Sequence, residues 1–342
     1  MSRRITFMQA INEGLDLAME KDDRVILLGE DIAGGALVDH LDGNGAWGGV
    51  FGVTKGLVEK YGMERVIDTP ISEMGYMGAS VGAAATGLRP VPELMFNDFL
   101  GFCFDTLLAQ GSKMRYMFGG KAKIPMTVRT CHGAGASAAA QHSGSYYGMF
   151  GSIPGLKVVV PSNPYDAKGL LLSAIEDDNI VIFSEDKTLY GLKDTVPEEY
   201  YTVEIGKAKV KREGTDLTIV TIGKMLYVAL DVATELEKSG VSVEVIDLIT
   251  VAPWDQETVL ESVKKTGRLI VIDEANPHNN TATDIASVVG DKAFDYLDGP
   301  IKTICAPNTP VPFASNLEAL YLPDKEKVLK QAEELISDLK KG

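Results

Sequence analysis

The sequence has few cysteines and no long apolar run. Three cysteines occur among 342 residues, at positions 103, 131 and 305, and no two of them form a CxxC pair. An odd number of widely separated cysteines is not a disulfide framework, so we expect a protein of the reducing cytoplasm. No segment approaches the roughly 20 consecutive apolar residues of a membrane helix, and no apolar stretch follows the N-terminal arginines. We therefore expect neither a membrane span nor a secretory signal.

Basic residues are also scarce relative to acidic ones. The 33 lysines and arginines face 48 aspartates and glutamates, which gives a formal net charge of −15. Such a field repels phosphate backbones and anionic lipids, so we expect no binding to nucleic acid or to a membrane surface. The 4 histidines show no HExxH or similar metal-ligand spacing, which argues against a zinc enzyme.

Apolar residues make up 45% of the chain, as in an ordinary globular protein, and the length suggests two domains. Short apolar runs alternate with helical patterns. The expected strands are 24–29, 91–96, 124–129, 156–160, 180–183, 217–223, 241–246, 268–273 and 301–305. The expected helices are 54–61, 98–114, 164–176, 225–238, 255–265, 281–293 and 324–340. The alternation predicts an α/β protein with two doubly wound parallel-sheet domains, 1–190 and 216–342, joined by a linker at 191–215.

Two helix starts carry specific signals. Thr6 and Gln9 form a capping box that opens a helix, with Ile11 and Leu15 along one face. Asn163 precedes Pro164, which is the pattern of an N-cap followed by a proline at the first helical position. Both patterns predict a helix from local chemistry alone.

Residues 71–90 form a glycine-rich helical segment. Gly75, Gly78 and Gly82 fall on one side of the expected helix, although glycine costs about 1 kcal/mol there relative to alanine. Close packing of the helix is the simpler explanation, and the close approach of a ligand is the other. Glu73 lies just before this helix, where the helix dipole by itself favours an acidic residue. A functional role for Glu73 requires a chemical reason for a carboxylate at the place where a ligand would come close to the helix backbone.

Other candidates have equally ordinary explanations when each is taken alone. His142 lies in a glycine- and alanine-rich stretch, where a histidine is more often a satisfied hydrogen-bond partner than a proton carrier, and His132 is its competitor. Phe99 belongs to an aromatic cluster typical of core packing. Asp177 and Asn179 follow the end of an expected helix, where they favour a turn but could also supply oxygens to a hard cation.

Taken together, several segments resemble one family. Residues 66–90, 139–143, 154–171 and 269–275 resemble the β subunit of the thiamine-diphosphate-dependent 2-oxo acid dehydrogenases, the decarboxylating first components of multienzyme complexes. The resemblance runs from about residue 4 to about residue 335. It implies a pyrimidine-binding transketolase-like domain followed by a transketolase C-terminal-like domain, and an oxidoreductase that acts through the thiamine cofactor.

Within that family, residues 39–57 and 93–99 look most like acetoin dehydrogenase β subunits, whereas pyruvate-type chains have a shorter loop at 34–49. The resemblance therefore implies cleavage of acetoin and transfer of the acetyl unit to a lipoyl group. The alternative is the pyruvate or branched-chain 2-oxo acid version, with the same site residues and carbon dioxide as product. A scaffold that binds no cofactor is a third hypothesis, but a scaffold has no chemical need for Glu73, Phe99 and His142.

The resemblance implies a role for each of these three side chains. Glu73 matches the glutamate that donates to the N1′ nitrogen of the aminopyrimidine and so promotes removal of the C2 proton. Phe99 matches the aromatic residue that stacks on the pyrimidine, a contact worth about 0.5–1.5 kcal/mol. His142 matches the histidine that orients substrate and assists acyl transfer to the lipoyl arm.

The resemblance also implies a potassium site and two partner proteins. Met126, Ala174, Asp177 and Asn179 match the residues whose oxygens hold a structural potassium ion. The chain has no Gly-Asp-Gly motif followed by Asn-Asn, the pattern that holds magnesium and the diphosphate in the family's α subunit. We therefore expect an α2β2 heterotetramer, with cofactor and magnesium shared with the α subunit. The C-terminal domain implies docking of the lipoyl acyltransferase core component.

Overall fold

The computed structural model describes residues 2–34 and 47–337 and contains two compact units. The first unit comprises residues 1–131 and 152–205, and the second comprises 132–151 and 206–342. Contacts thus assign the predicted linker partly to each unit, and they assign the segment around His142 to the second. The acetoin-type loop at 34–49 lies largely outside the described residues. In the described part of the chain, no helix has the length and apolarity needed to cross a bilayer.

The first unit is built on a parallel sheet. Its strand order is β6-β7-β5-β4-β2-β3, and the register is parallel for β2 with β3 and β4, β4 with β5, and β6 with β7. The strands are β2 (Val25–Gly29), β3 (Val66–Asp68), β4 (Arg89–Phe96), β5 (Thr127–His132), β6 (Lys157–Val159) and β7 (Val181–Asp186). Every residue of β2, β5 and β7 is buried, as expected for strands covered on both faces.

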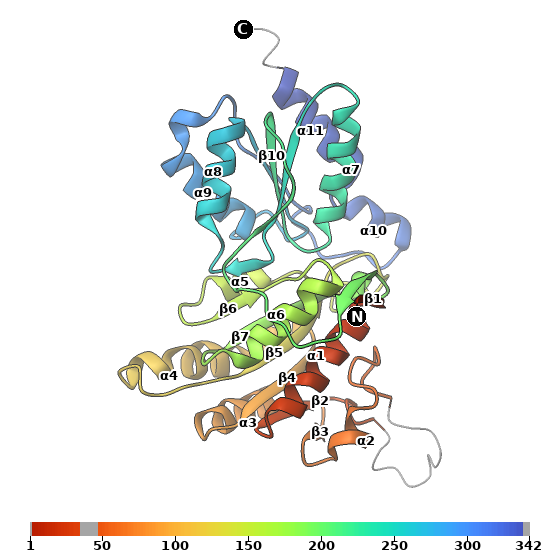
Figure 1. The fold of residues 1–342 in the computed structure, drawn as a ribbon, viewed down its shortest axis with the longest axis vertical. Helices are drawn as coiled ribbons and strands as arrows, with labels where there is room; N and C mark the ends of the chain where they lie inside the picture. The colour runs from red at the N-terminus through yellow and green to blue at the C-terminus, as the bar shows by residue number, and fades with distance from the viewer. Residues whose placement is uncertain (1, 35–46, 338–342) are drawn as a thin grey trace. The chain divides into compact units, whose positions relative to one another are not determined.

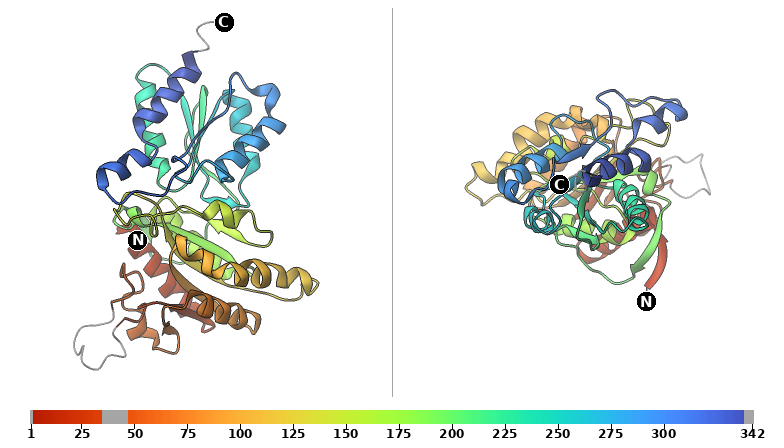
Figure 2. Two further views of the ribbon diagram at one scale, coloured as in Figure 1. Left: turned by 180° about the vertical axis from the view of Figure 1, so that it is seen from behind. Right: turned by 90° about the horizontal axis from the view of Figure 1, so that it is seen from above.

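Helices cover both faces of this sheet, as Figures 1 and 2 show. Helices α1 (Phe7–Lys21) and α6 (Pro164–Glu176) pack against each other on one face. On the opposite face, α3 (Glu73–Ala85) packs on β4. Beside α3 lie a 3₁₀ segment η2 (Asn97–Cys103), a π-helical turn η3 (Asp105–Gly111) and α4 (Ser112–Met117). The short α2 (Leu57–Tyr61) precedes β3.

The two predicted helix starts are confirmed. The Thr6 hydroxyl accepts from the amide of Gln9 at 3.1 Å, and the Gln9 side chain accepts from the amide of Thr6 at 2.9 Å. The side chain of Asn163 accepts from the amide of Asp166 at 2.9 Å, and Pro164 is the first residue of α6. Each cap satisfies backbone donors that the helix itself leaves unpaired.

An antiparallel ribbon inside the first unit was not predicted. Strand β1 (Ser2–Thr6) pairs with β8 (Lys193–Pro197), which follows a short 3₁₀ turn η4 (Lys187–Leu189). β8 occupies part of the predicted linker. Its pattern of exposed and buried residues is too short to distinguish it from a loop without knowledge of its partner strand.

The second unit has its own sheet, in the order β14-β13-β10-β11-β9. Strands β10 (Leu217–Thr221), β11 (Val243–Asp247), β13 (Leu269–Ile272) and β14 (Lys302–Ile304) are parallel, and β9 (Lys209–Arg212) joins the edge antiparallel. Figures 1 and 2 show α7 (Met225–Glu237) and α11 (Lys325–Ser337) on one face, with α8 (Gln256–Thr266) and α9 (Thr281–Lys292) on the other. Ile219, Val245 and Ile270 are completely buried at the centre of this core.

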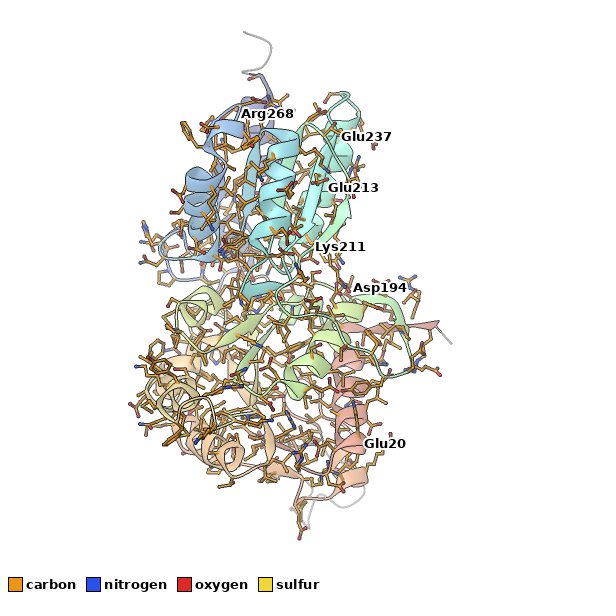
Figure 3. All side chains as sticks on the ribbon, turned by 60° about the vertical axis from the view of Figure 1, so that its left-hand side comes forward. Glu20, Asp194, Lys211, Glu213, Glu237 and Arg268 are labelled. Atoms are coloured by element: carbon orange, nitrogen blue, oxygen red, sulfur yellow. The ribbon has the colours of Figure 1, made fainter. Side chains whose placement is uncertain are left out.

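Charged side chains line the β9 edge of that sheet. Arg212 pairs with Glu237 at 3.0 Å and Lys265 pairs with Glu213 at 3.2 Å; Figure 3 shows Lys211, Glu213 and Glu237 there. Charges on an edge strand discourage pairing with other strands.

The remaining elements of the second unit are short: α5 (Tyr147–Gly151), β12 (Thr250–Ala252), η5 (Phe294–Tyr296) and α10 (Ser315–Tyr321). The predicted α/β class is therefore confirmed.

Candidate functional site

Polar and aromatic side chains gather where three neighbouring strands of the first unit end. Glu30 directly follows β2, Glu73 lies shortly after β3, and Phe99 lies in η2, directly after β4. These strands are neighbours in the order β4-β2-β3, and their carboxyl ends meet at one edge of the sheet. This edge is where open parallel sheets bind ligands.

Glu73 is the first residue of α3 and is half-buried. Ser72 precedes it as N-cap without a capping side-chain hydrogen bond, and its carbonyl accepts from the amide of Gly75 at 2.9 Å. A Cβ at position 75 would lie 2.7 Å from the Ser72 hydroxyl, which is the end of an exposed side chain. As the first residue of α3, Glu73 sits at the positive end of the helix dipole.

The surroundings of Glu73 are acidic and partly apolar. Burial raises the pKa of the Glu30 carboxyl, and the negative charge of Glu73 raises it further. Burial likewise raises the pKa of the Cys103 thiol to about 12, again with a contribution from Glu73. Among the described residues, Glu30 Oε1 is buried without a hydrogen-bond partner. Sequence analysis missed Glu30; the available signal was an acidic residue directly after a buried strand.

The glycine face of α3 is open rather than packed within this chain. A Cβ at Gly82 would meet nothing within 4 Å, and one at Gly78 would only reach the Thr106 hydroxyl at 4.0 Å. At the start of the same helix, Ile71 is 83% exposed and Met74 is 63% exposed. Close packing inside the chain therefore does not account for Gly82, and this face remains available to another molecule.

Phe99 takes part in the predicted aromatic cluster but is only half-buried. Its ring lies 5.7 Å from that of Phe96 in an edge-to-face arrangement, and 6.5 Å from that of Phe102. The flanking Leu100 and Cys103 are completely buried. η2 is thus anchored by its neighbours, and Phe99 keeps a partly exposed ring of the kind that stacks on planar ligands.

His142 belongs to a segment of the second unit that has no helix or strand between residues 133 and 146. It is half-buried, and its backbone amide donates to the carbonyl of Ala139 at 3.4 Å. Glu73 and Phe99 thus both lie beyond the carboxyl edge of the first unit's sheet, and His142 lies in the second unit.

His132, the competing histidine, is almost fully buried in a polar network at the start of the same segment. Its Nε2 lies 3.3 Å from Glu274 Oε1, and Lys224 Nζ lies 2.8 Å from Glu274 Oε2. Burial alone would raise the pKa of Glu274, but the Lys224 ammonium and the His132 ring lower it overall. Nearby, the Tyr147 hydroxyl donates to Asp273, whose pKa burial raises to about 6. His132 is therefore a buried polar partner of Glu274.

The residues of the predicted potassium site lie close to one another in the first unit. The Met126 carbonyl accepts from the amide of Val181 at 2.9 Å, and the Ala174 carbonyl accepts from the amide of Asp177 at 3.3 Å. Asn179 donates its backbone amide and its side-chain amide to Asp177 Oδ1, both at 2.8 Å. The four residues thus surround the turn between α6 and β7.

Cationic side chains of this chain already pair with the side-chain oxygens of that turn. Lys157 binds Asp177 Oδ2, and Arg115 donates to Asn179 Oδ1 at 3.0 Å. Arg89 donates to the carbonyls of Ile175 and Asp177 at 2.8 and 3.1 Å. A bound cation would therefore depend on the second lone pairs of backbone carbonyls rather than on the carboxylate.

Family models match both units of the chain. Residues 3–193 match the transketolase pyrimidine binding domain, and residues 206–328 match the transketolase C-terminal domain. A solved structure titled as an inactive β4 tetramer of a split-gene transketolase superposes with a TM-score of 0.76, covering 97% of this chain and 98% of that one. At 20% identity it supports the fold alone.

Curated relatives extend the match over the whole chain. The β subunit of acetoin:2,6-dichlorophenolindophenol oxidoreductase from Bacillus subtilis (strain 168) is 59% identical over 99% of each chain. The same subunit from Cupriavidus necator is 52% identical over 96% of each chain. The β subunit of the pyruvate dehydrogenase E1 component from Bacillus subtilis is 42% identical, over 97% of this chain and 99% of that one. The chain therefore belongs to the family of acetoin and pyruvate dehydrogenase β subunits, with the transketolase pyrimidine-binding and C-terminal domains.

Proposed function

We propose that this chain is the β subunit of a thiamine-diphosphate-dependent acetoin dehydrogenase. The enzyme would cleave acetoin to acetaldehyde and a second two-carbon unit at the same oxidation level. That unit would be oxidised to acetyl as it passes to the lipoyl group of an acyltransferase partner, whose disulfide is reduced by the same two electrons. The observation that carries the proposal is the 59% identity to an acetoin-oxidising β subunit, against 42% to the pyruvate dehydrogenase β subunit of the same organism. The pyruvate or branched-chain 2-oxo acid enzyme remains the second candidate.

The carboxyl edge of the first sheet fits the pyrimidine half of thiamine diphosphate. When bound, the cofactor would supply the nucleophilic carbon and the electron sink for the cleaved bond. Glu73 would share a proton with the ring nitrogen N1′, and its place at the start of α3 puts it at the positive end of the helix dipole. Phe99 would stack on the ring through its uncovered part, and the open glycine face would permit close approach of a second protein.

His142 would act on the substrate side of the reaction. Its segment offers small side chains and half-buried positions, which leave room for a substrate or a lipoyl arm. A neutral imidazole there can accept a hydrogen bond from a substrate hydroxyl and can move a proton during acyl transfer. We therefore assign Glu73 to the cofactor and His142 to the acyl transfer step.

We further propose that the chain works with an α subunit in an α2β2 assembly, and with a lipoyl acyltransferase. The relatives are named as β subunits, which supports a partner chain. The α subunit would hold the diphosphate and its magnesium ion, for which this sequence has no Gly-Asp-Gly motif. Domain 216–342 would supply the contact to the acyltransferase.

A structural potassium ion is proposed at the turn after α6. The carbonyls of Met126 and Ala174 and the backbone oxygens of Asp177 and Asn179 would hold it, since the side-chain oxygens are engaged by Lys157 and Arg115. If the ion binds, replacing potassium with sodium at equal ionic strength lowers the midpoint of thermal unfolding by a few degrees. Equal midpoints in the two salts would contradict the site.

Substrate comparison tests the proposed activity. The chain would be co-expressed with its α subunit, and reduction of 2,6-dichlorophenolindophenol would be followed with acetoin, pyruvate and a branched-chain 2-oxo acid. We expect kcat/KM for acetoin to exceed that for either 2-oxo acid by at least about tenfold, equivalent to about 1.4 kcal/mol of transition-state preference. A higher kcat/KM for pyruvate would replace the proposal with the second candidate.

A further inference from the structure

The segment that carries His142 has an alternating backbone. Gly133, Gly135, Ser137 and Ala139 have φ values of 98°, 105°, 50° and 62°, in the left-handed region. For Ser137 and Ala139 this conformation is unfavourable, so neighbouring contacts must maintain it. Left-handed residues at alternate positions can turn nearby backbone N–H groups toward one point and so form an anion-binding concavity.

Glu318 of helix α10 fills that concavity. Its Oε1 accepts from the amide of Gly135 at 2.6 Å, and its Oε2 accepts from the amide of Ser137 at 2.8 Å. The side chain is 2% exposed, although glutamate is rarely buried to this extent. Charge-assisted hydrogen bonds of this kind are shorter and stronger than neutral ones. The carboxylate thus fixes two backbone amides of a segment that has no regular structure of its own.

A second side chain holds the residue just before this point. Lys224 Nζ donates to the carbonyl of Ala134 at 2.5 Å and pairs with Glu274 at 2.8 Å. Lys224, a cation, therefore holds the carbonyl of residue 134. Glu318, an anion, holds the amides of residues 135 and 137. The two side chains come from different helical regions of the second unit. This arrangement fixes the direction of the chain as it approaches His142.

We propose that Glu318 is a positioning residue for His142. The inference rests on the proposed function, because it assumes that His142 acts in acyl transfer. Only five positions separate Ser137 from His142, and the amide of His142 bonds back to Ala139 at 3.4 Å. Loss of the carboxylate would release the amides of Gly135 and Ser137 and let the imidazole move. Because Glu318 bonds to the His142 segment in the second unit, whereas Glu73 belongs to the first unit, the C2–H exchange step should be spared.

The test uses Glu318→Gln in the complex reconstituted with the α subunit. Glutamine offers one acceptor oxygen, and its NH₂ group would face the other backbone donor. We expect faster amide hydrogen exchange in residues 133–142 and a kcat for acetyl transfer to lipoamide about 10- to 100-fold lower, as for a side chain displaced by about 1 Å. The rate of C2–H exchange should stay within about twofold. Glu318→Asp keeps two acceptor oxygens and should regain part of the transfer rate.

Two controls separate the possible failures. Glu326→Gln, at an exposed position in the first turn of α11, makes the same charge change and should alter neither measurement. Unchanged amide exchange in residues 133–142 of Glu318→Gln would overturn the inference, as would a parallel fall of C2–H exchange and acetyl transfer. If His142→Ala retained full acetyl transfer, the proposed role of His142 would fail, whereas the amide exchange result would still decide whether Glu318 holds the segment.

Discussion

At the scale of single residues, environment rather than residue type separates the acidic side chains of this protein. Burial raises the pKa of the Glu30 carboxyl, and the nearby charge of Glu73 raises it further. Although burial raises the pKa of the Glu274 carboxyl, Lys224 and His132 lower it overall. Glu318 holds backbone amides. Each carboxyl group thus has a distinct task that its own neighbours define.

Replacement of Phe99 tests cofactor stacking. We expect Phe99→Leu to keep most of the buried apolar area but to lose the aromatic contact, raising the dissociation constant for thiamine diphosphate about 2- to 13-fold. Titration of the reconstituted complex with cofactor would measure this change. Phe102→Leu is the matched control, because that ring is 64% exposed on the same 3₁₀ segment. Equal effects of the two substitutions would remove Phe99 from the cofactor site.

Asp273 provides a pH-dependent prediction. Its folded-state pKa is raised from 3.8 to about 6 by burial, so the folded state binds this proton more tightly than the unfolded state. This contribution is therefore fully stabilising below about pH 4 and is lost as the pH rises to about 6. The free energy of unfolding of Asp273→Asn should therefore rise relative to that of wild type as the pH increases from 4 to 7. The relative gain should reach about 2–3 kcal/mol at pH 7. Urea unfolding at pH 4.5 and pH 7 would measure the difference, and a constant difference would contradict it.

At the scale of secondary-structure elements, the helix caps are the most local determinants. Asn163→Ala removes the acceptor for the amide of Asp166 and also a 2.6 Å hydrogen bond from Asn163 Nδ2 to the Asp166 carboxylate. We expect a loss of about 1–2 kcal/mol in the free energy of unfolding. Ser72→Ala, at an N-cap without a side-chain bond, should cost less than about 0.5 kcal/mol. Chemical denaturation compares the two, and similar losses would refute the capping argument.

Elements whose signals are local were predicted well, and those set by distant contacts were not. Helix α6 begins at Pro164 as predicted, because Asn163 and Pro164 determine its start. Strand β5 begins at Thr127, three positions later than expected, because Ile124 and Met126 are buried before the ladder begins. The single helix expected at 98–114 is divided into 3₁₀, π and α segments. There a Cβ at Gly111 would lie 2.4 Å from the side chain of Ile180, a constraint that no local pattern reveals.

In the candidate site, too, residues with a signal in the sequence could be predicted, and residues defined by distant contacts could not. Glu73 follows β3 and Phe99 follows β4, the two strands that flank β2. The family resemblance selected both residues, and their roles stay predictions. Glu318 was not identified, because its partner Ser137 lies 181 positions away in the sequence. Its role depends on backbone conformation at residues that carry small side chains. Neither the long separation in sequence nor the backbone conformation leaves a recognisable sequence motif.

At the scale of the whole molecule, the chain matches the pyrimidine-binding and C-terminal domains of its family. We expect the isolated chain to bind thiamine diphosphate and magnesium weakly, because the proposed diphosphate site belongs to the α subunit. Calorimetric titration of the chain alone and of the α–β complex would compare the two affinities. Tight stoichiometric binding to the isolated chain would contradict the shared site.

The most direct measurement is the rate of C2–H exchange of thiamine diphosphate in the reconstituted complex, compared between wild type and Glu73→Gln. Glu20→Gln, on the exposed end of α1 labelled in Figure 3, is the matched control. We predict that Glu73→Gln assembles and unfolds like wild type but exchanges this proton at least about 100-fold more slowly, while the control exchanges normally. A near-normal exchange rate in Glu73→Gln would contradict the assignment of this carboxyl group to the cofactor.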